Sequence, residues 1–143
     1  MQVKHILHGK GREVVTIGCN STLSEAARLL ARRRIGAVLV RGNDGAIAGI
    51  LSERDVVRAV SESSVQALAQ SVAAHMTPDV VFCSEEDAVE DLMELMTHRR
   101  FRHVPVVADG QLCGIVSIGD VVKTRIAETV QEVAVLREYI VAG

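Results

Sequence analysis

The sequence has 143 residues, of which 48% are hydrophobic, and a formal net charge of −2 at pH 7. A chain of this length forms one domain or two small halves that share a core, and it needs neither a metal nor a disulfide to fold. The small net charge gives no global field that would recruit nucleic acid, and Phe82, Phe101 and Tyr139 are too few aromatic residues for a stacking platform.

Cysteine usage and hydropathy predict a cytoplasmic protein. Cys19, Cys83 and Cys113 are odd in number and lack CxxC spacing, which argues for a reducing compartment and against a disulfide framework or zinc knuckle. No apolar run approaches the roughly 18 residues that a membrane span needs, and we expect no secretory leader. His5 and His8 have no further ligands at suitable spacing, so we expect surface histidines and no metal site.

The first half of the chain predicts one strand-helix-strand-strand-helix unit. Residues 1–13 predict a short helix or an irregular arm. Asn20 or Ser21 is a plausible N-cap for the periodic run that follows, and three arginines at 32–34 suit the end of that helix, where cations meet its dipole. Residues 42–45 have the composition of a hairpin turn. The predicted elements are a strand at 14–17, a helix to 34, strands at 37–40 and 47–51, and a helix from 52 to about 60.

The second half repeats this order after a connecting segment. Pro105 falls within a predicted strand, so it must lie where the sheet needs no N–H donor. The apolar stripe of the last helix is longer than one small unit covers, and we expect part of it to pack on another subunit. The predicted elements are a connecting helix at 65–76, a strand at 80–82, a helix to about 98, strands at 104–107 and 112–116, and a helix from about 119 to 140.

An internal repeat organises the whole chain. Gly49–Asp55 and Gly114–Asp120 both read Gly, two aliphatic residues, Ser, two variable residues and Asp. Residues 23–30 align with 89–96, and residues 35–40 align with 101–106. Because a repeat sets the architecture, we expect an α/β (α+β) fold. Its expected segments are an N-terminal arm at 1–13, unit 1 at 14–62, a connecting helix and linker at 63–79, unit 2 at 80–127 and a C-terminal helix extension at 128–143.

The Ser-x-x-Asp pattern inside both motifs has a structural and a functional interpretation. Ser and Asp at this spacing form a capping box, which by itself explains the pattern. A helix start also binds anions, since its N–H groups and a hydroxyl hold phosphate, and an adjacent Asp accepts hydrogen bonds from ribose hydroxyls. The two interpretations are compatible. Recurrence in both copies favours a ligand at Ser52 with Asp55 and at Ser117 with Asp120.

Arg102 and His103 precede the middle strand of the second copy. Arg grips phosphate oxygens in a fork and His adds a second donor, although a solvent-facing pair is the alternative. The first copy has Ile35 and Gly36 there, so the two potential sites differ. We find no G-x-S-x-G, P-loop or dinucleotide-binding glycine motif, and we expect no catalytic residue.

The two motifs, with Arg102–Val106 between them, closely resemble those of a pair of CBS domains, or Bateman module, over roughly residues 12–127. The combination is similar to small stand-alone bacterial members of that family. The resemblance implies two β-α-β-β-α units packed sheet to sheet with pseudo-twofold symmetry. It also implies two clefts that bind AMP, ADP, ATP, NAD(H) or S-adenosylmethionine, with no obligatory cofactor.

The resemblance also assigns the ligand-binding residues. In the family the motif Asp holds the ribose and the motif Ser holds phosphate, and each cleft takes residues from both halves. The Asp120 cleft is expected to contain Val14, Val15, Ile35, Gly36, Arg102, His103, Ile115 and Ser117. The Asp55 cleft is expected to contain Ile50, Ser52, Arg54, Thr77, Val80, Val81, Phe101 and Arg102.

The leading hypothesis is a non-enzymatic regulatory module that binds an adenosine nucleotide. Such a module acts as a homodimer, and a regulated protein partner reads the arrangement that the nucleotide favours. The alternatives are a nucleotide-processing enzyme and a nucleic-acid-binding module. No membrane association is expected.

Overall fold

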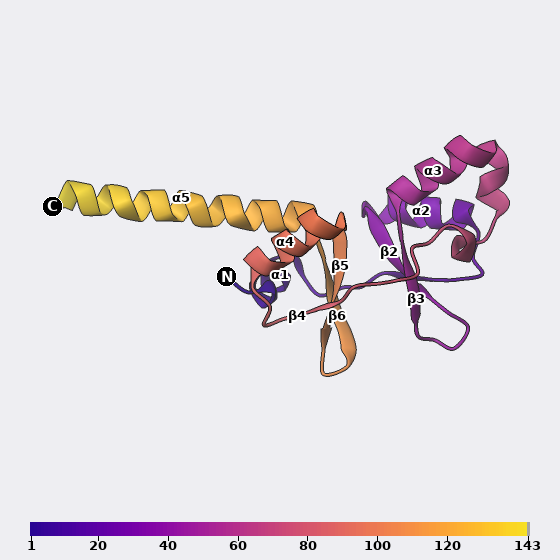
Figure 1. Cartoon of the computed structure of the whole chain (residues 1–143), viewed down its shortest axis with the longest axis horizontal. Coiled ribbons are helices and arrows are strands. Elements are labelled where there is room, and N and C mark those ends of the chain that lie inside the picture. The colour runs from indigo at the N-terminus through magenta and orange to yellow at the C-terminus, as the bar shows by residue number, and fades with distance from the viewer. Residues whose placement is uncertain (143) are drawn as a thin grey trace. The chain divides into compact units, whose positions relative to one another are not determined.

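The computed structural model describes residues 1–142, which form five α-helices and two three-stranded sheets. Contacts divide the chain into two compact units. Val14–Val81 make up the first-repeat unit, and Met1–Glu13 with the chain from Phe82 onward make up the second-repeat unit. Each unit holds one copy of the sequence repeat, and Figure 1 shows helices against the sheet of each.

The first-repeat unit has the predicted strand-helix-strand-strand-helix order. Its sheet has the order β1-β2-β3, with β1 parallel and β3 antiparallel to the central strand β2. Leu23, Val38 and Leu51 are almost fully buried in one core that joins the sheet to both helices. The elements are β1 (Thr16–Gly18), α2 (Leu23–Arg33), β2 (Ala37–Arg41), β3 (Ile47–Ser52) and α3 (Glu53–Ser63).

The second-repeat unit has the same topology, so the predicted mixed α/β fold is confirmed. Its sheet has the order β4-β5-β6, again with one parallel and one antiparallel pairing. Val89, Val104 and Val116 are fully buried in its core. The elements are β4 (Cys83–Ser84), α4 (Val89–Arg99), β5 (His103–Ala108), β6 (Gln111–Ser117) and α5 (Ile118–Ala142).

Residues 1–13 form helix α1 (Val3–Lys10) and pack as part of the second-repeat unit. Val3 and Leu7 are fully buried in the core of that unit. The N–H groups of Val3 and Lys4 donate to the carbonyls of Asp87 and Glu85, both at 2.9 Å. Of the two alternatives for this stretch, the helix is correct, because its apolar residues at helical spacing have a core to enter.

The connecting α-helix predicted at 65–76 is wrong. Two short 3₁₀ helices, η1 (Ser64–Ala69) and η2 (Val72–Ala74), lie there instead. The N–H of Leu23 donates to the carbonyl of Gln70 at 2.9 Å, and the N–H of Val72 donates to the carbonyl of Ser21 at 2.8 Å. These bonds to the start of α2 use backbone groups that a continuous helix would need for itself.

The N-cap predicted for α2 is also wrong. Thr22 caps this helix, and its hydroxyl accepts a hydrogen bond from the N–H of Glu25 at 3.1 Å. Thr22 also forms an isolated antiparallel bridge with Ser71. The bridge holds Thr22 in the extended conformation that an N-cap requires, so α2 begins later than Asn20 or Ser21 would allow.

The strand predicted at Val80–Phe82 is not formed, because β4 begins only at Cys83. In the first-repeat unit the equivalent strand β1 begins one repeat position earlier, and the N–H of Leu39 donates to the carbonyl of Val15 at 3.3 Å. Pro105 stands at the position of Leu39 and has no N–H to donate. β4 therefore pairs with β5 only at Val106 and Val107, beyond the proline.

Candidate functional site

Ser52 and Asp55 form a capping box where β3 passes into α3. The hydroxyl of Ser52 accepts a hydrogen bond from the N–H of Asp55 at 3.3 Å, and the N–H of Ser52 donates to Asp55 Oδ2 at 2.8 Å. Arg58 Nη1 donates to the other oxygen, Oδ1, at 3.3 Å. The capping interpretation is confirmed here, and it places a carboxylate and a hydroxyl at the positive end of the helix dipole.

Ser117 and Asp120 repeat this arrangement at the start of α5. The N–H of Ser117 donates to Asp120 Oδ2 at 2.8 Å, and the N–H of Asp120 donates to the hydroxyl of Ser117 at 3.2 Å. The side chain of Asp120 is 22% exposed, whereas that of Asp55 is 8% exposed. Asp120 is therefore the more accessible of the two motif carboxylates.

A backbone hydrogen bond brings the residue before each central strand to the start of the following helix. The N–H of Glu53 donates to the carbonyl of Gly36 at 2.9 Å, and the N–H of Ile118 donates to the carbonyl of Arg102 at 2.8 Å. Strand pairing places His103 opposite Ser117. Arg102 and His103 thus lie beside the motif of the second-repeat unit, at the place that Gly36 and Ala37 take in the first. The predicted counterparts, Ile35 and Gly36, are one residue too early.

The glycine that opens each motif lets another segment of the same unit approach the sheet closely. A Cβ on Gly49 would lie 2.6 Å from Met76 Sδ and 2.7 Å from the carbonyl oxygen of Thr77. A Cβ on Gly114 would lie 2.5 Å from Leu7 Cδ2. Both glycines therefore have a packing role. The two copies also correspond in the segments that lead into them. Helix α1 leads into the first copy and contacts β6 of the second, and the Met76–Thr77 segment leads into the second copy and contacts β3 of the first.

Two further predicted site residues, Ile50 and Thr77, meet through this contact. Each donates its N–H to the carbonyl of the other at 2.9 Å, which forms an isolated antiparallel bridge. In the second-repeat unit, the carbonyl of Ile115 takes the place of that of Ile50, and it accepts a hydrogen bond from Lys10 Nζ at 3.0 Å. A lysine side chain of α1 thus reaches the motif of the second copy.

Lys10 also binds the Asp120 carboxylate, with Nζ 2.6 Å from Oδ2. Burial by itself raises the pKa of Asp120, but the hydrogen bonds from Lys10 and Ser117 and the charge of Lys10 outweigh it and hold the pKa below its ordinary value. A ribose that binds this carboxylate must displace or share the ammonium group. Sequence reasoning missed Lys10, because it is 110 residues from Asp120 and carries no motif.

The other predicted site residues do not contact the motif carboxylates of their own unit through any hydrogen bond or ion pair found in residues 1–142. Arg54 is exposed on the first turn of α3, and Phe101 packs against the core of the second-repeat unit, with the Arg99 guanidinium 5.6 Å from its ring centroid. Val14, Val15, Val80 and Val81 are half-buried. The clefts assigned from the sequence combine residues of both units, and those assignments stay predictions.

Two of the cysteines have raised pKa values, which disfavours a thiolate nucleophile at either position. Burial raises the pKa of Cys83 to about 12, so its thiol stays protonated near neutral pH. Burial, with a hydrogen bond to Glu85, also raises the pKa of Cys113. Within residues 1–142, no group of three or more His, Cys, Asp or Glu side chains could hold a metal ion.

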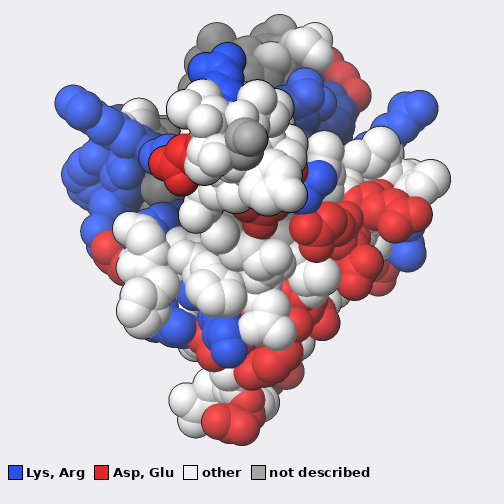
Figure 2. Space-filling view, turned by 90° about the vertical axis from the view of Figure 1, so that its left-hand side faces the viewer, with Lys and Arg blue, Asp and Glu red and all other residues white. Residues whose placement is uncertain are grey.

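Surface charge on the face drawn in Figure 2 is mixed. Basic and acidic side chains both occur there with uncharged surface between them, and neither sign covers the face. Since nucleic-acid binding relies on a continuous basic surface, this face offers no such footprint. None of the helices formed by residues 1–142 is long and apolar enough to cross a membrane.

Comparison with known families gives two matches along the chain. The family model described as "CBS domain" matches residues 3–62 and again residues 70–127. The crystal structure of the CBS-domain containing protein ATU1752 from Agrobacterium tumefaciens is similar, with 50% identity, a TM-score of 0.83, and coverage of 87% of this chain and 92% of that one.

Two more distant relatives extend the comparison. The CBS domain protein PAE2072 from Pyrobaculum aerophilum, solved in complex with AMP, is 26% identical with a TM-score of 0.73, and the match covers 84% of this chain and 89% of that one. The mitochondrial CBS domain-containing protein CBSX3 of Arabidopsis thaliana is 33% identical over 141 residues, or 94% of this chain and 68% of the relative. The chain spans about two thirds of the first two curated relatives and about a fifth of the next two.

Proposed function

Because the chain belongs to the CBS-domain family and holds two CBS domains in tandem, we propose that it is a non-enzymatic regulatory module that binds an adenosine nucleotide. AMP, ADP, ATP, NAD(H) and S-adenosylmethionine are the ligands to consider. The AMP complex of PAE2072 supports an adenosine ligand in a relative with this fold. The protein partner that responds to the ligand is a separate molecule of unknown identity.

The observation that carries this proposal is the repeated Ser-Asp pair at a helix start. Each pair places a hydroxyl and a carboxylate at the positive end of a helix dipole. Helix N–H groups and hydroxyls bind phosphate, and a carboxylate accepts hydrogen bonds from both hydroxyls of a ribose. One pair of residues therefore offers partners for the two polar parts of a nucleotide.

We propose that the two sites are unequal. Asp120 is more exposed than Asp55, and Arg102 and His103 lie beside its motif. Arginine binds phosphate oxygens through two parallel hydrogen bonds, which are stronger than neutral ones. The more phosphorylated end of a ligand therefore binds near Asp120.

Regulation follows from differential binding. A nucleotide shifts the equilibrium toward the arrangement of the module that the nucleotide binds more tightly. The free energy of this shift cannot exceed the difference between its binding free energies for the two arrangements. We propose that the module works as a homodimer in the cytoplasm, where its three free cysteines stay reduced. The nucleotide-binding repeats correspond to residues 14–62 and 80–127.

Isothermal titration calorimetry tests the proposal. The purified protein is titrated with AMP, ADP, ATP, NADH, S-adenosylmethionine and adenosine, and cytidine monophosphate serves as the base control. We expect saturable binding of at least one adenosine compound and little binding of the cytidine control. A ligand at a hundred times its Kd should also stabilise the fold by about 2.7 kcal/mol. Absence of binding to all six adenosine compounds would overturn the proposal.

A further inference from the structure

Helix α5 carries a long row of exposed apolar side chains. Of its 25 residues, only Val121 is buried. Ile126, Leu136 and Ile140 are 59%, 60% and 73% exposed. Figure 1 shows α5 continuing far past α1 and α4, the helices of its own unit that it contacts. A soluble surface rarely leaves such a row uncovered unless another surface packs on it.

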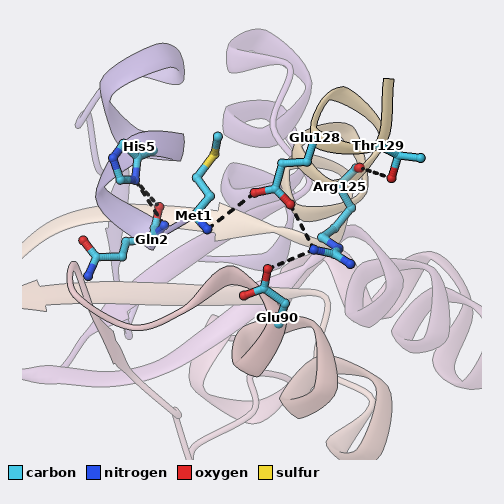
Figure 3. A network of polar contacts seen from close by, with 7 residues as sticks. All are labelled: Met1, Gln2, His5, Glu90, Arg125, Glu128 and Thr129. Carbon is cyan, nitrogen blue, oxygen red and sulfur yellow. Dashed lines mark hydrogen bonds and ion pairs between the residues drawn. The ribbon is translucent and has the colours of Figure 1, made fainter. Parts of the chain in front are cut away.

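Contacts within the second-repeat unit fix the first turns of α5 but use another side of the helix. Arg125 Nη1 lies 2.9 Å from Glu90 of α4 and 2.9 Å from Glu128, and the amino group of Met1 lies 3.5 Å from Glu128 (Figure 3). At 3.6 residues per turn, Arg125 and Glu128 share a side with the buried Val121, about a quarter turn from the apolar row. The anchoring contacts therefore leave the row free along its whole length.

The spacing of this row is that of a two-stranded coiled coil. Its members alternate at intervals of four and three residues, which is the heptad pattern of a and d positions. Each a position holds a β-branched residue, which together with leucine at d favours two parallel strands. Of the three d positions only Leu136 is leucine, and Thr129 is polar. The a positions are Ile126, Val133 and Ile140, and the d positions are Val122, Thr129 and Leu136.

Charges beside the row are complementary for a parallel, in-register pair. Glu132 occupies a g position and Arg137 occupies the e position that follows it. In a parallel pair, a g residue of one helix meets the next e residue of the other. Two copies of α5 in register would therefore form this Glu-Arg contact twice, once on each side of the apolar seam.

We propose that α5 pairs over residues 122–140 with α5 of a second copy, as a parallel, in-register coiled coil. This pairing is the surface through which the proposed homodimer would form. It contains neither motif carboxylate, so it does not depend on nucleotide binding. The seam is short for a coiled coil, so the pair is a weak one on its own. Asp120 lies in the first turn of α5. The pairing would therefore connect the Asp120 sites of the two copies through the paired helices.

Disulfide trapping tests both the pairing and its register. Leu136→Cys places a thiol at the last of the three d positions, and Glu138→Cys places one two residues away on the opposite side of the helix. Both residues are exposed, so neither change disturbs the core. Under mild oxidation we expect Leu136→Cys to give a covalent dimer at least about ten times faster than Glu138→Cys. Peptide mass spectrometry should identify the bond between the two introduced cysteines, which separates it from any bond of Cys19, Cys83 or Cys113. Absence of this bond, or equal rates for both variants, would overturn the pairing.

Charge reversal tests the orientation independently. Glu132→Arg should weaken the dimer, because it places Arg beside Arg137 of the other copy, and adding Arg137→Glu in the same chain should restore it. Light scattering over a concentration series measures how strongly the single and the double variant dimerise. Glu138→Arg is the control for the added positive charge. A double variant no stronger than Glu132→Arg would overturn the parallel register. If Leu136→Lys leaves a full dimer, α5 pairing is wrong but the homodimer stands. A wild-type monomer at all concentrations overturns both, and the nucleotide titrations remain a separate test.

Discussion

Asp55 and Asp120 have the same capping hydrogen bonds but different cations. Asp55 contacts Arg58, one turn further along its own helix, whereas Asp120 binds Lys10 from α1. Lys10 thus contacts the carboxylate that we assign to the ribose. The amine competes with an uncharged nucleoside, but it would lie near the phosphate of a nucleotide.

Lys10→Met should therefore tighten adenosine binding by about 1.4- to fivefold, since partly exposed ion pairs contribute about 0.2–1 kcal/mol. AMP should gain less, because the variant also loses a cation near the phosphate. Lys4→Met, at an exposed position of the same helix, is the control. Calorimetry that shows equal changes for adenosine and AMP, or weaker adenosine binding, would contradict the role of Lys10.

The same ion pair predicts a dependence of stability on pH. The pKa of Asp120 is held below its ordinary value of 3.8, so the ionised carboxylate stabilises the fold fully above about that pH. This stabilisation is lost as the pH falls through the lower pKa of the folded state. Lys10→Met removes the main cause of the lowered pKa. Urea unfolding at about pH 6 and pH 3 should show a smaller loss of stability for Lys10→Met than for the wild type, and a larger loss would show that the pair does not act this way.

Arg102 tests the inequality of the two sites. Arg102→Ala should weaken ATP at least about tenfold and adenosine little, because it removes a charge-assisted contact to phosphate worth about 1.5–3 kcal/mol. Arg28→Ala, an exposed arginine of α2 that is not among the predicted site residues, is the matched control. The difference should vanish when Asp120 is also replaced by Ala. If Arg102→Ala weakens ATP and adenosine equally, Arg102 does not bind phosphate. If its effect disappears with Asp55→Ala and not with Asp120→Ala, Arg102 does not belong to the Asp120 site.

Local spacing could predict the capping boxes, because Ser and Asp interact within one turn of helix. It could not predict the ion pair of Lys10, whose position depends on α1 entering the core of the second-repeat unit. Thr22 shows the same limit at shorter range. Asn20 and Ser21 are equally good caps by residue type, and the bridge to Ser71 decides between them.

The segment that leads into each repeat contacts the last strand of the other repeat at a glycine. The atoms that make this contact differ between Gly49 and Gly114. At Gly49 the nearest neighbours include the backbone oxygen of Thr77, which cannot move without breaking its bridge to Ile50. At Gly114 they are the methyl carbons of Leu7, the far end of a side chain.

Gly49→Ala should consequently destabilise the fold more than Gly114→Ala, by about 2–3 against about 1–2 kcal/mol on the scale of overpacked cores. Gly9→Ala is the control, since a Cβ there meets nothing within 4 Å. Alanine in that helix should be neutral or stabilise by up to about 1 kcal/mol. Chemical unfolding measures all three, and a Gly114 variant less stable than the Gly49 variant would contradict this packing account.

Elements with strong periodicity could be predicted from sequence, including α2, α4, α5 and the central strands. The two wrong elements depend on long-range hydrogen bonding. Pro105 shortens β4 by withholding a donor from a strand distant in sequence. Gln70 and Ser71 stay extended because the start of α2 pairs with them. Neither effect can be predicted from the residues of the affected segment itself.

The repeat determines the architecture of the whole molecule more than any single element does. It predicted two units of equal topology, and both are present. The apolar pattern of the last helix, which is not part of the repeat, predicted a stripe that exceeds its own unit, and only Val121 of α5 is buried. We expect the two sites to differ in chemistry through residues in which the copies differ, Arg102 and His103 against Gly36 and Ala37.

The measurement that tests adenosine-nucleotide binding most directly is the calorimetric titration of AMP into the wild type and into a variant with both Asp55→Ala and Asp120→Ala. A second variant with Asn at both positions retains a capping acceptor, and circular dichroism checks that each is folded. Losing the hydrogen bonds of a charged acceptor costs about 1.5–3 kcal/mol, or roughly 10- to 150-fold in affinity. We predict saturable binding of AMP to the wild type and affinity at least about tenfold lower in both folded variants. Equal affinity in all three proteins, or no binding to the wild type, would contradict the account.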